Sequence, residues 1–287
     1  MFELLIIIQQ LIASLSHIIA KDITHDIIPT TVLIIRAFIA SLVFTTWIIV
    51  KKAYKIKIDK SDFLKILILG LINVPINQFL FFQAISKTSA PNVSLAYALT
   101  PVFVFIIAFF YLKEKASFNK IIGIAVAVAG TVILLSEKGF KFTPDGVMGD
   151  ILALIASISW ALYTIIGKNL IRKYNPIYIT GLTMIIGFLL YIPIFLSLDV
   201  QFEGINISTK NWFQFFYLGA FTSAIGYAIW YYALTKIDAS KLSVYNNLQP
   251  ALTAILALIF FGTPITLYFL FGGSLIVGGV FLTQRAK

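Results

Sequence analysis

Long hydrophobic stretches separated by short polar breaks dominate the chain. Cutting the sequence at its charged, proline-rich and polar breaks leaves ten stretches, each near the length of about 20 apolar residues that an α-helix needs to cross a bilayer. Continuous apolar runs differ from the alternating pattern of a transmembrane β-barrel. We therefore predict an all-α integral membrane protein with ten transmembrane helices. The predicted spans are residues 3–21, 29–50, 63–85, 91–112, 119–136, 149–168, 176–198, 212–234, 241–261 and 265–283.

The second half of the chain repeats the first. An offset of 149 residues aligns the third to fifth spans with the eighth to tenth without a gap, and an offset of 147 aligns residues near the first span with the sixth. Each half holds five spans, an odd number, so the halves should enter the membrane in opposite orientations. We predict two inverted five-helix repeats, residues 1–142 and 143–287, an architecture of secondary carriers with a substrate site at the repeat interface. Matching pairs are Pro101 and Pro250, Gly123 and Gly272, Gly130 and Gly279, Ala90 and Ala239, and Lys21 and Lys168.

Charge is scarce and one-sided. Only 12% of the residues are charged, against about 25% in soluble domains. With a cytoplasmic N-terminus, sixteen of the 22 Lys and Arg residues fall at the inner ends of the spans and five at the outer ends. The positive-inside rule then places both termini in the cytoplasm, so the net charge of +10 reports orientation in the cell inner membrane and not nucleic-acid binding. The N-terminal run lacks a basic region, so we interpret it as a first span and not as a signal peptide.

Polar residues inside the predicted spans are the candidate binding residues, because a polar group in hydrocarbon is costly unless it has a partner or faces water. In the first span, Gln10, Ser14, His17 and Lys21 recur at helical spacing on one face. This stripe indicates a cavity lining, with His17 as a candidate proton carrier. The alternative is hydrogen bonding to neighbouring helices.

The third span carries Asn73, Asn77 and Gln78 around Pro75. The proline removes a backbone hydrogen bond, and such irregular backbone is tolerated where it is buried in protein or lines a cavity. Amide side chains offer donors and acceptors without charge, which suits a ligand with carboxylate and amine groups. Packing between helices is again the alternative.

The ninth span carries Tyr245, Asn246 and Gln249 beside Pro250. The repeat mates of Asn246 and Gln249 in the fourth span are Tyr97 and Thr100, so both inverted elements place polar groups at the same depth. A cavity on the pseudo-twofold axis would require this placement. We expect the first, third, fourth, sixth, eighth and ninth spans to line the cavity, and the fifth and tenth to act as scaffold.

Aromatic residues and one arginine complete the candidates. Trp160 and Tyr163 in the sixth span and Tyr227 and Trp230 in the eighth could contact an apolar part of a ligand, or could be core residues or interface anchors. Arg36 is charged and lies well inside a span. Pairing with an acidic residue near the end of the first span, reaching outward to the interface, and substrate contact all remain open for it.

Several stretches resemble the EamA-type transporters of the drug/metabolite transporter superfamily. They are Ser89 to Pro101 (SAPNVSLAYALTP), Tyr111 to Ser117 (YLKEKAS), Ser159 to Thr164 (SWALYT) and Gly226 to Lys236 (GYAIWYYALTK). The resemblance covers nearly the whole chain and implies export or exchange of small polar metabolites, often amino acids or nucleobases, through a central cavity. The chain departs from the family pattern at Thr263, where the family usually has an acidic residue, as Glu114 supplies in the first half.

Other function classes lack their motifs. The chain has two histidines and no cysteine, and it shows no phosphate-binding loop, zinc-protease motif or nucleophile elbow. We therefore expect no enzyme, no cofactor and no metal; a channel or facilitator is the main alternative, and an integral-membrane enzyme ranks below it. The expected partners are a small-molecule substrate, the lipid bilayer, and a coupling proton or counter-substrate, without nucleic acid, for a monomer or homodimer.

Overall fold

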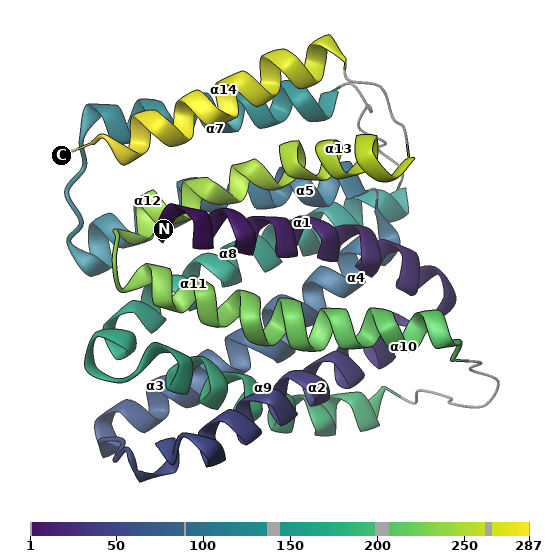
Figure 1. Cartoon of the computed structure of the whole chain (residues 1–287), viewed down its shortest axis with the longest axis vertical. Coiled ribbons are helices and arrows are strands. Elements are labelled where there is room, and N and C mark those ends of the chain that lie inside the picture. Colours follow the sequence, from purple (N-terminus) through teal and green to yellow (C-terminus); the bar gives the residue numbers. More distant parts are fainter. Residues whose placement is uncertain (1, 89, 137–143, 199–206, 262–265, 287) are drawn as a thin grey trace.

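The computed structural model describes residues 2–88, 90–136, 144–198, 207–261 and 266–286. Within these ranges every regular element is a helix (Figure 1). The α-helices are α1 (Phe2–Asp26), α2 (Pro29–Val50), α3 (Lys60–Leu71), α4 (Phe79–Lys87), α5 (Ala90–Ala98), α6 (Thr100–Ile107), α7 (Phe118–Ser136), α8 (Pro144–Lys173), α9 (Pro176–Ser197), α10 (Thr209–Phe216), α11 (Tyr227–Leu234), α12 (Ala239–Ser243), α13 (Leu248–Phe261) and α14 (Leu267–Gln284). Two segments are 3₁₀-helices, η1 (Ala53–Lys55) and η5 (Val244–Asn247), and three are π-helices, η2 (Ile72–Gln78), η3 (Ala108–Leu112) and η4 (Tyr217–Gly226).

Eight helical stretches in the described part of the chain are long and apolar enough to cross a membrane. Two further long stretches, 209–234 and 239–261, are continuous helix in Figure 1 but are not among the eight. Residues 209–234 are rich in tyrosine, tryptophan and small polar residues, which lowers the mean hydropathy of that stretch. The eight are Glu3–Asp26, Pro29–Val50, Lys60–Lys87, Leu95–Leu112, Phe118–Ser136, Gly146–Lys173, Pro176–Ser197 and Leu267–Gln284.

Prolines begin two of these helices and lie beside three of the interior irregularities. Helices α2 and α9 begin at Pro29 and Pro176, where the missing N–H has no intrahelical partner in any case. Inside a helix, proline clashes with the carbonyl four residues earlier. Accordingly, the π-segment η2 surrounds Pro75, the chain turns at Leu99 before Pro101, and the 3₁₀-segment η5 precedes Pro250.

Helices α7 and α14 pack backbone to backbone through paired glycines. A Cβ atom added at Gly130 would lie 2.7 Å from the carbonyl oxygen of Gly272, and one added at Gly279 would lie 2.6 Å from that of Gly123. Only residues without a side chain allow this approach, as in small-residue contacts between membrane helices. The contact joins two helices of one chain, and it places α7 and α14 together at the edge of the bundle (Figure 1).

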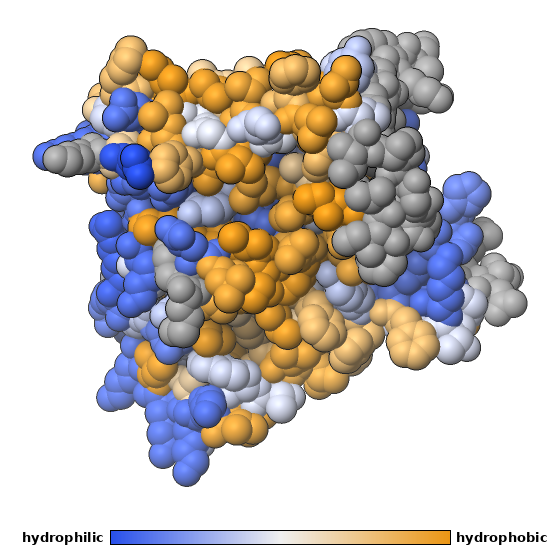
Figure 2. All heavy atoms as spheres, turned by 45° about the horizontal axis from the view of Figure 1, so that its top comes forward, coloured by the Kyte–Doolittle hydropathy of each residue, from blue (hydrophilic) through white to orange (hydrophobic). Residues whose placement is uncertain are grey.

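The bundle has two distinct ends. Both termini lie at one end, beside α12, which we call the terminus end, whereas α4 finishes and α10 begins at the opposite, far end (Figure 1). Figure 2 shows a hydrophobic surface between these ends, with hydrophilic residues gathered toward the two sides. Helix α1 packs against α4, α11 and α13 in the middle of the bundle, so its side chains are placed to line an interior space.

Candidate functional site

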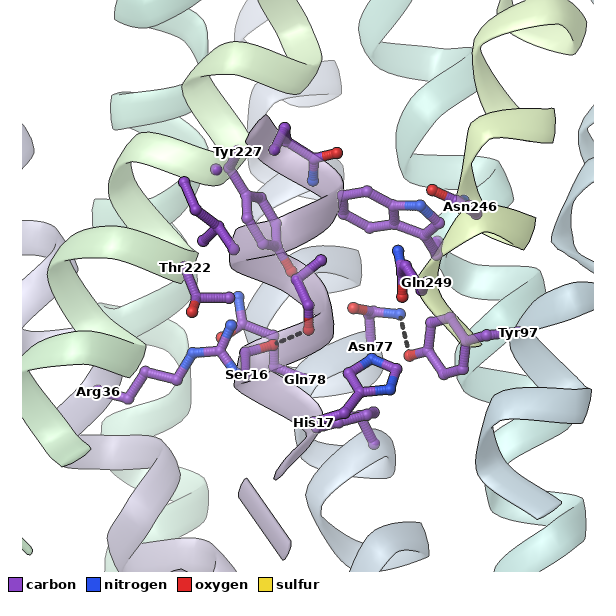
Figure 3. A pocket seen from close by; sticks show the side chains of 16 residues that line it. Ser16, His17, Arg36, Asn77, Gln78, Tyr97, Thr222, Tyr227, Asn246 and Gln249 are labelled. Atoms are coloured by element: carbon purple, nitrogen blue, oxygen red, sulfur yellow. Dashed lines mark hydrogen bonds between the residues drawn. The ribbon is translucent and has the colours of Figure 1, made fainter. Parts of the chain in front are cut away.

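A cavity lies inside the bundle where helices from both halves of the chain meet (Figure 3). Its volume, taken as the space open to the centres of water molecules, is about 80 Å³. Because a single water needs at least roughly 10–15 Å³ of such space, the cavity has room for a few water-sized groups. The lining residues are Gln9, Ile12, Ala13, Ser16, His17, Arg36, Asn77, Gln78, Phe81, Tyr97, Trp160, Thr222, Gly226, Tyr227, Asn246 and Gln249.

Helix α1 faces the cavity with Gln9, Ser16 and His17. The His17 ring packs on the rings of Phe81 and Tyr97, at centroid distances of 5.3 and 6.2 Å. The sequence stripe through Gln10 and Ser14 is therefore turned slightly away from the cavity, because one residue rotates a helix by about 100°.

The turned-away residues of α1 hold the helix against η5 and α13. Gln10 donates to the side-chain oxygen of Asn246 at 3.3 Å and accepts from Gln249 at 2.8 Å. Ser14 is fully buried and donates to backbone carbonyls of Gln10, at 2.7 Å, and of Gln249, at 3.2 Å. These bonds fix two cavity-lining amides, Asn246 and Gln249, in place.

The π-segment η2 supplies the opposite amides. Asn77 donates to the carbonyl of Ala156 at 2.7 Å and to the Tyr97 hydroxyl at 3.3 Å, the bond drawn in Figure 3. Gln78 follows it around the wider turn and lines the same cavity. Single-turn π-segments are frequent at functional sites because they re-aim side chains within a helix.

Stacked aromatic rings form one wall. Trp160 lies against Tyr227 at a centroid distance of 5.0 Å and an interplanar angle of 73°, and both line the cavity. Behind them, Tyr163 and Trp230 contact Trp160 at 5.6 and 5.5 Å. The wall is rigid, and it presents ring faces and edges to whatever occupies the cavity.

Eight of the thirteen residues predicted from the sequence line this cavity: His17, Asn77, Gln78, Tyr97, Trp160, Tyr227, Asn246 and Gln249. The other five lie outside the lining. Three of them bond a neighbouring helix: Thr100 bonds Ser157 at 2.8 Å, Tyr163 bonds Thr183 at 3.0 Å, and Trp230 donates to Thr164 at 3.1 Å. Asn73 accepts from Gln78 at 2.9 Å within η2. Tyr245 is buried in the hydrophobic core.

Sequence reasoning did not include Gln9, Ser16, Arg36 or Thr222 among the predicted site residues, although all four line the cavity. Gln9 and Ser16 share a helical face with Ala13 at spacings of four and three residues, which is a signal that the sequence contains. Thr222 was visible as the repeat mate of Asn73. Arg36 stood out by its charge, but its surroundings could not be read from the sequence.

Arg36 is buried, with 4% of its surface exposed, and its guanidinium extends toward Ser16 and Gln78 in Figure 3. Its Nε donates to the hydroxyl of Ser223 at 2.5 Å, and its guanidinium lies 5.4 Å from the centre of the Phe82 ring. The nearby acid Asp22 pairs instead with Lys210, at 2.6 Å. Among the described residues no carboxylate forms an ion pair with Arg36.

A buried ion-pair cluster ties elements together at the terminus end. Glu114 accepts from Lys168 at 3.0 Å, from the backbone N–H of Ala239 at 2.8 Å and from the Ser240 hydroxyl at 2.5 Å. Lys120 reaches Asp238 at 3.4 Å. Burial raises the pKa of Glu114, but the Ser240 hydrogen bond and the Lys168 charge outweigh burial, so that pKa lies below its ordinary value. We call Glu114, Lys120, Lys168, Asp238 and Ser240 the Glu114 cluster.

The far end is held by a set of contacts around Lys21, Thr88, Asn92 and Asp150, which we call the Lys21 cluster. Lys21 is exposed and donates to the backbone carbonyls of Ile85 and Thr88, at 2.7 and 3.3 Å. Asp150 accepts from the Thr88 hydroxyl at 2.7 Å and from Asn92 at 2.9 and 3.0 Å. Within the described part of the chain Lys21 forms no ion pair, and Thr263 lies outside the described residues.

The described residues hold no group of three or more histidines and acids placed to bind a metal ion. The lining is built from amides, hydroxyls, aromatic rings and one guanidinium. Such groups can bind and orient a small polar molecule, and the helices around them are long and apolar enough to cross a membrane.

These features define a multi-pass membrane transporter. The chain belongs to the EamA-like transporter family, which it matches over residues 1–136 and again over 147–285. Two proteins of Archaeoglobus fulgidus named as uncharacterized transporters are 29% identical over 90% of this chain and 90% of the relative, and 27% identical over 99% and 98%. The uncharacterized transporter YyaM of Bacillus subtilis is 30% identical over 75% of this chain and 70% of its own length.

A solved crystal structure shares the fold. It superposes with a TM-score of 0.76 at 19% sequence identity, covering 96% of this chain and 98% of the other. At this identity the likeness describes the fold alone.

Proposed function

We propose that the chain is a secondary carrier that exports or exchanges small polar metabolites, such as amino acids, by alternating access through the central cavity. The observation that carries the proposal is the cavity itself, which is lined by polar groups from segments far apart in the sequence. Its amides and hydroxyls offer donors and acceptors at a depth where the surrounding helices are apolar. The cytoplasmic membrane, with both termini inside, is the proposed location.

Ten membrane-spanning helices arranged as two inverted repeats, 1–142 and 143–287, belong to the same proposal. Two matched pairs of irregular segments support the repeat. The π-segment η2 at 72–78 corresponds, at the 149-residue offset, to 221–227, which overlaps the π-segment η4. The break at Leu99 corresponds to Leu248, which directly follows η5. Helices α10–α11 and α12–α13 would then be the eighth and ninth spans.

Alternating access requires the two ends of the cavity to open in turn. The Glu114 cluster joins the first half of the chain to the second at the terminus end, and the Lys21 cluster does so at the far end. Breaking and remaking these contacts is the motion that a rocking of two repeats would demand. Pro75, Pro101 and Pro250, each next to an irregular segment, are candidate bend points.

The test is substrate flux through the purified chain. Thermal-shift screening against amino acids, nucleobases and polyamines identifies a ligand, and counterflow of that ligand in proteoliposomes then measures transport. A carrier shows saturable counterflow, whereas a channel passes solute at rates that do not saturate at millimolar concentrations. Linear, unsaturated flux would contradict the carrier.

Two variants test the site. Asn77→Ala and Gln249→Ala each remove an amide from the lining, and we expect each to lower counterflow by about tenfold, since a hydrogen bond to a ligand contributes on the order of 1–1.5 kcal/mol. The matched control is Gln83→Ala, an amide of α4 outside the lining. Unchanged kinetics in both lining variants, at normal expression, would remove the site from the proposal.

A further inference from the structure

The guanidinium of Arg36 has N–H donors that form no hydrogen bond with the described residues. One of its five N–H donors, on Nε, is bonded to Ser223 at 2.5 Å. The Nη atoms make no hydrogen bond to any described residue, and the Phe82 ring at 5.4 Å contributes only a cation–π contact. Ser223 therefore orients the planar group while its forked edge is left for another partner.

The charge of Arg36 is not balanced within the cavity. None of the sixteen lining residues is aspartate or glutamate. Asp22, on the neighbouring helix α1, is engaged with Lys210 and with the amide of Gln214. A buried cation without a paired anion is costly in a membrane, so this arrangement is stable only when water or an anionic ligand meets the guanidinium.

Neighbouring polar groups extend the same subsite. Ser16 and Gln78 lie in front of the guanidinium in Figure 3, and Thr222 lies beside it. The Thr222 hydroxyl is buried, with 8% of the residue exposed, and has no hydrogen-bond partner among the described residues. Buried polar atoms in native proteins are nearly always paired, so this hydroxyl has a hydrogen bond to offer to a polar molecule in the cavity, whether water or ligand.

Geometry and size select the chemical class of that molecule. A guanidinium presents parallel donors that match the two oxygens of a carboxylate. A cavity of about 80 Å³ favours a small carboxylate with a short side chain over a large one. Beyond Arg36 the lining contains no Asp, Glu or Lys. Its amides can hydrogen-bond an amine of the ligand, and the faces of Trp160 and Tyr227 suit an apolar substituent.

We infer that Arg36 anchors the carboxylate of the transported molecule, so that the site selects small carboxylates over cations and over neutral molecules of the same shape. This inference rests on the proposed function, because it names the substrate class of the same cavity.

The test compares matched probes on the purified full-length chain in detergent. Thermal-shift titrations use lactate against lactamide and L-alanine against L-alaninamide, with putrescine as a cation and inorganic phosphate as a second anion. We expect each carboxylate to reach half-saturation at a concentration roughly 10- to 100-fold lower than its amide, the range of a hydrogen bond to a charged group. Putrescine should give no shift.

Variants locate the effect at Arg36. Arg36→Gln should abolish the difference between carboxylate and amide, whereas Arg36→Lys should keep part of it, because an ammonium retains the charge but not the fork. Arg172→Gln is the matched control, since Arg172 is exposed and outside the lining. If Arg36→Gln does not fold, the wild-type comparison of carboxylate with amide and the Arg36→Lys variant decide the question without it.

Each outcome is decisive. The inference is overturned if amides or putrescine stabilise the wild type as well as carboxylates, if phosphate stabilises it better than every carboxylate, if no carboxylate stabilises it, or if Arg36→Gln binds carboxylates like the wild type. Carboxylate-selective binding without counterflow in proteoliposomes would support Arg36 as the anchor while contradicting the proposed transport function.

Discussion

The Glu114 cluster and the Lys21 cluster close the two ends of the bundle with unequal contacts. At the terminus end the Glu114 and Lys168 side chains are only 8% and 4% exposed, and they pair at 3.0 Å. At the far end Lys21 is exposed and bonds only to carbonyl oxygens among the described residues. A buried pair gains more from each Coulomb contact than an exposed one, which solvent screens.

The two lysines nevertheless resemble each other closely. Lys168 donates to the carbonyl of Ile237 at 3.3 Å, and Lys21 donates to that of Thr88 at 3.3 Å. Under the proposed repeat these lysines correspond at an offset of 147 residues and these carbonyls at 149. The two lysine sites therefore differ in one acidic residue. Glu114 pairs with Lys168, while the position that corresponds to Glu114 in the second half is Thr263.

For a carrier with two alternating ends, this difference sets which end is harder to open. Opening the terminus end separates a buried carboxylate from an ammonium and from the first N–H groups of α12. Opening the far end separates the exposed Lys21 from backbone carbonyls and Asp150 from two neutral donors, and breaks no buried ion pair among the described residues. We expect the chain to favour the state that is closed at its terminus end, and three substitutions test this expectation.

The largest effect is expected for Glu114→Gln. This change leaves Lys168 buried without its 3.0 Å partner, and removing one member of a buried pair costs on the order of 3–5 kcal/mol. Asp238 lies 4.0 Å from Lys168 and compensates in part, so we expect a loss of about 3 kcal/mol in the free energy of unfolding, measured in mixed detergent micelles. Adding Lys168→Met should restore part of it.

Accessibility of the cavity to a labelling reagent tests the same substitution by a second measurement. The chain has no native cysteine, so Ser16→Cys places a single thiol in the cavity lining. Glu114→Gln should increase labelling of this thiol by an impermeant reagent added at the terminus end. A variant as stable as the wild type, with unchanged labelling, would mean that the Glu114 cluster does not close that end.

A smaller effect is expected for Asp150→Ala at the far end. The change removes the acceptor of Thr88 and Asn92, each only 6% exposed, so two neutral donors lose a partner but no buried charge is left unpaired. The expected loss is about 1–2 kcal/mol, and labelling at Ser16→Cys should rise from the far side. If Asp150→Ala destabilises the chain more than Glu114→Gln, the inequality between the ends is wrong.

Helix boundaries were the part of the fold most open to prediction. Predicted spans 29–50 and 176–198 match α2 and α9 at their proline starts, and 119–136 matches α7 within one residue. Apolar length and proline chemistry are local properties, so they can be read directly from the sequence. The existence of irregular segments near Pro75 and Pro250 followed from the same chemistry, but whether each became a π- or a 3₁₀-segment depends on packing.

The site was less predictable because its geometry is set by distant contacts. On α1 the cavity receives Gln9 and Ser16, whereas Gln10 and Ser14 bond α13, and adjacent residues of a polar stripe cannot be told apart without the partner helix. The pairing of Arg36 with Ser223 joins positions 187 residues apart. Thr100 was a sound candidate by polarity, but it bonds Ser157 on α8, a packing partner that no local pattern reveals.

The smallest effect, and the sharpest test of the comparison, is expected for Thr263→Glu. By the repeat offset, residue 263 corresponds to Glu114, so under the proposed repeat we expect the new carboxylate to pair with Lys21 as Glu114 pairs with Lys168. Because Lys21 is exposed, the pair should add only about 0.3–1 kcal/mol to the free energy of unfolding, and 0.5 M salt should erase the gain. The effect on conformation should be larger than the effect on stability. Far-side labelling at Ser16→Cys should fall, and counterflow should slow, because both ends would then be closed by an ion pair.

The isosteric control Thr263→Gln adds the same bulk without charge and should leave labelling unchanged. Equal effects of the two substitutions would show that the difference between the ends does not lie in this acid, and would remove the symmetry argument on which the comparison of Lys21 with Lys168 depends.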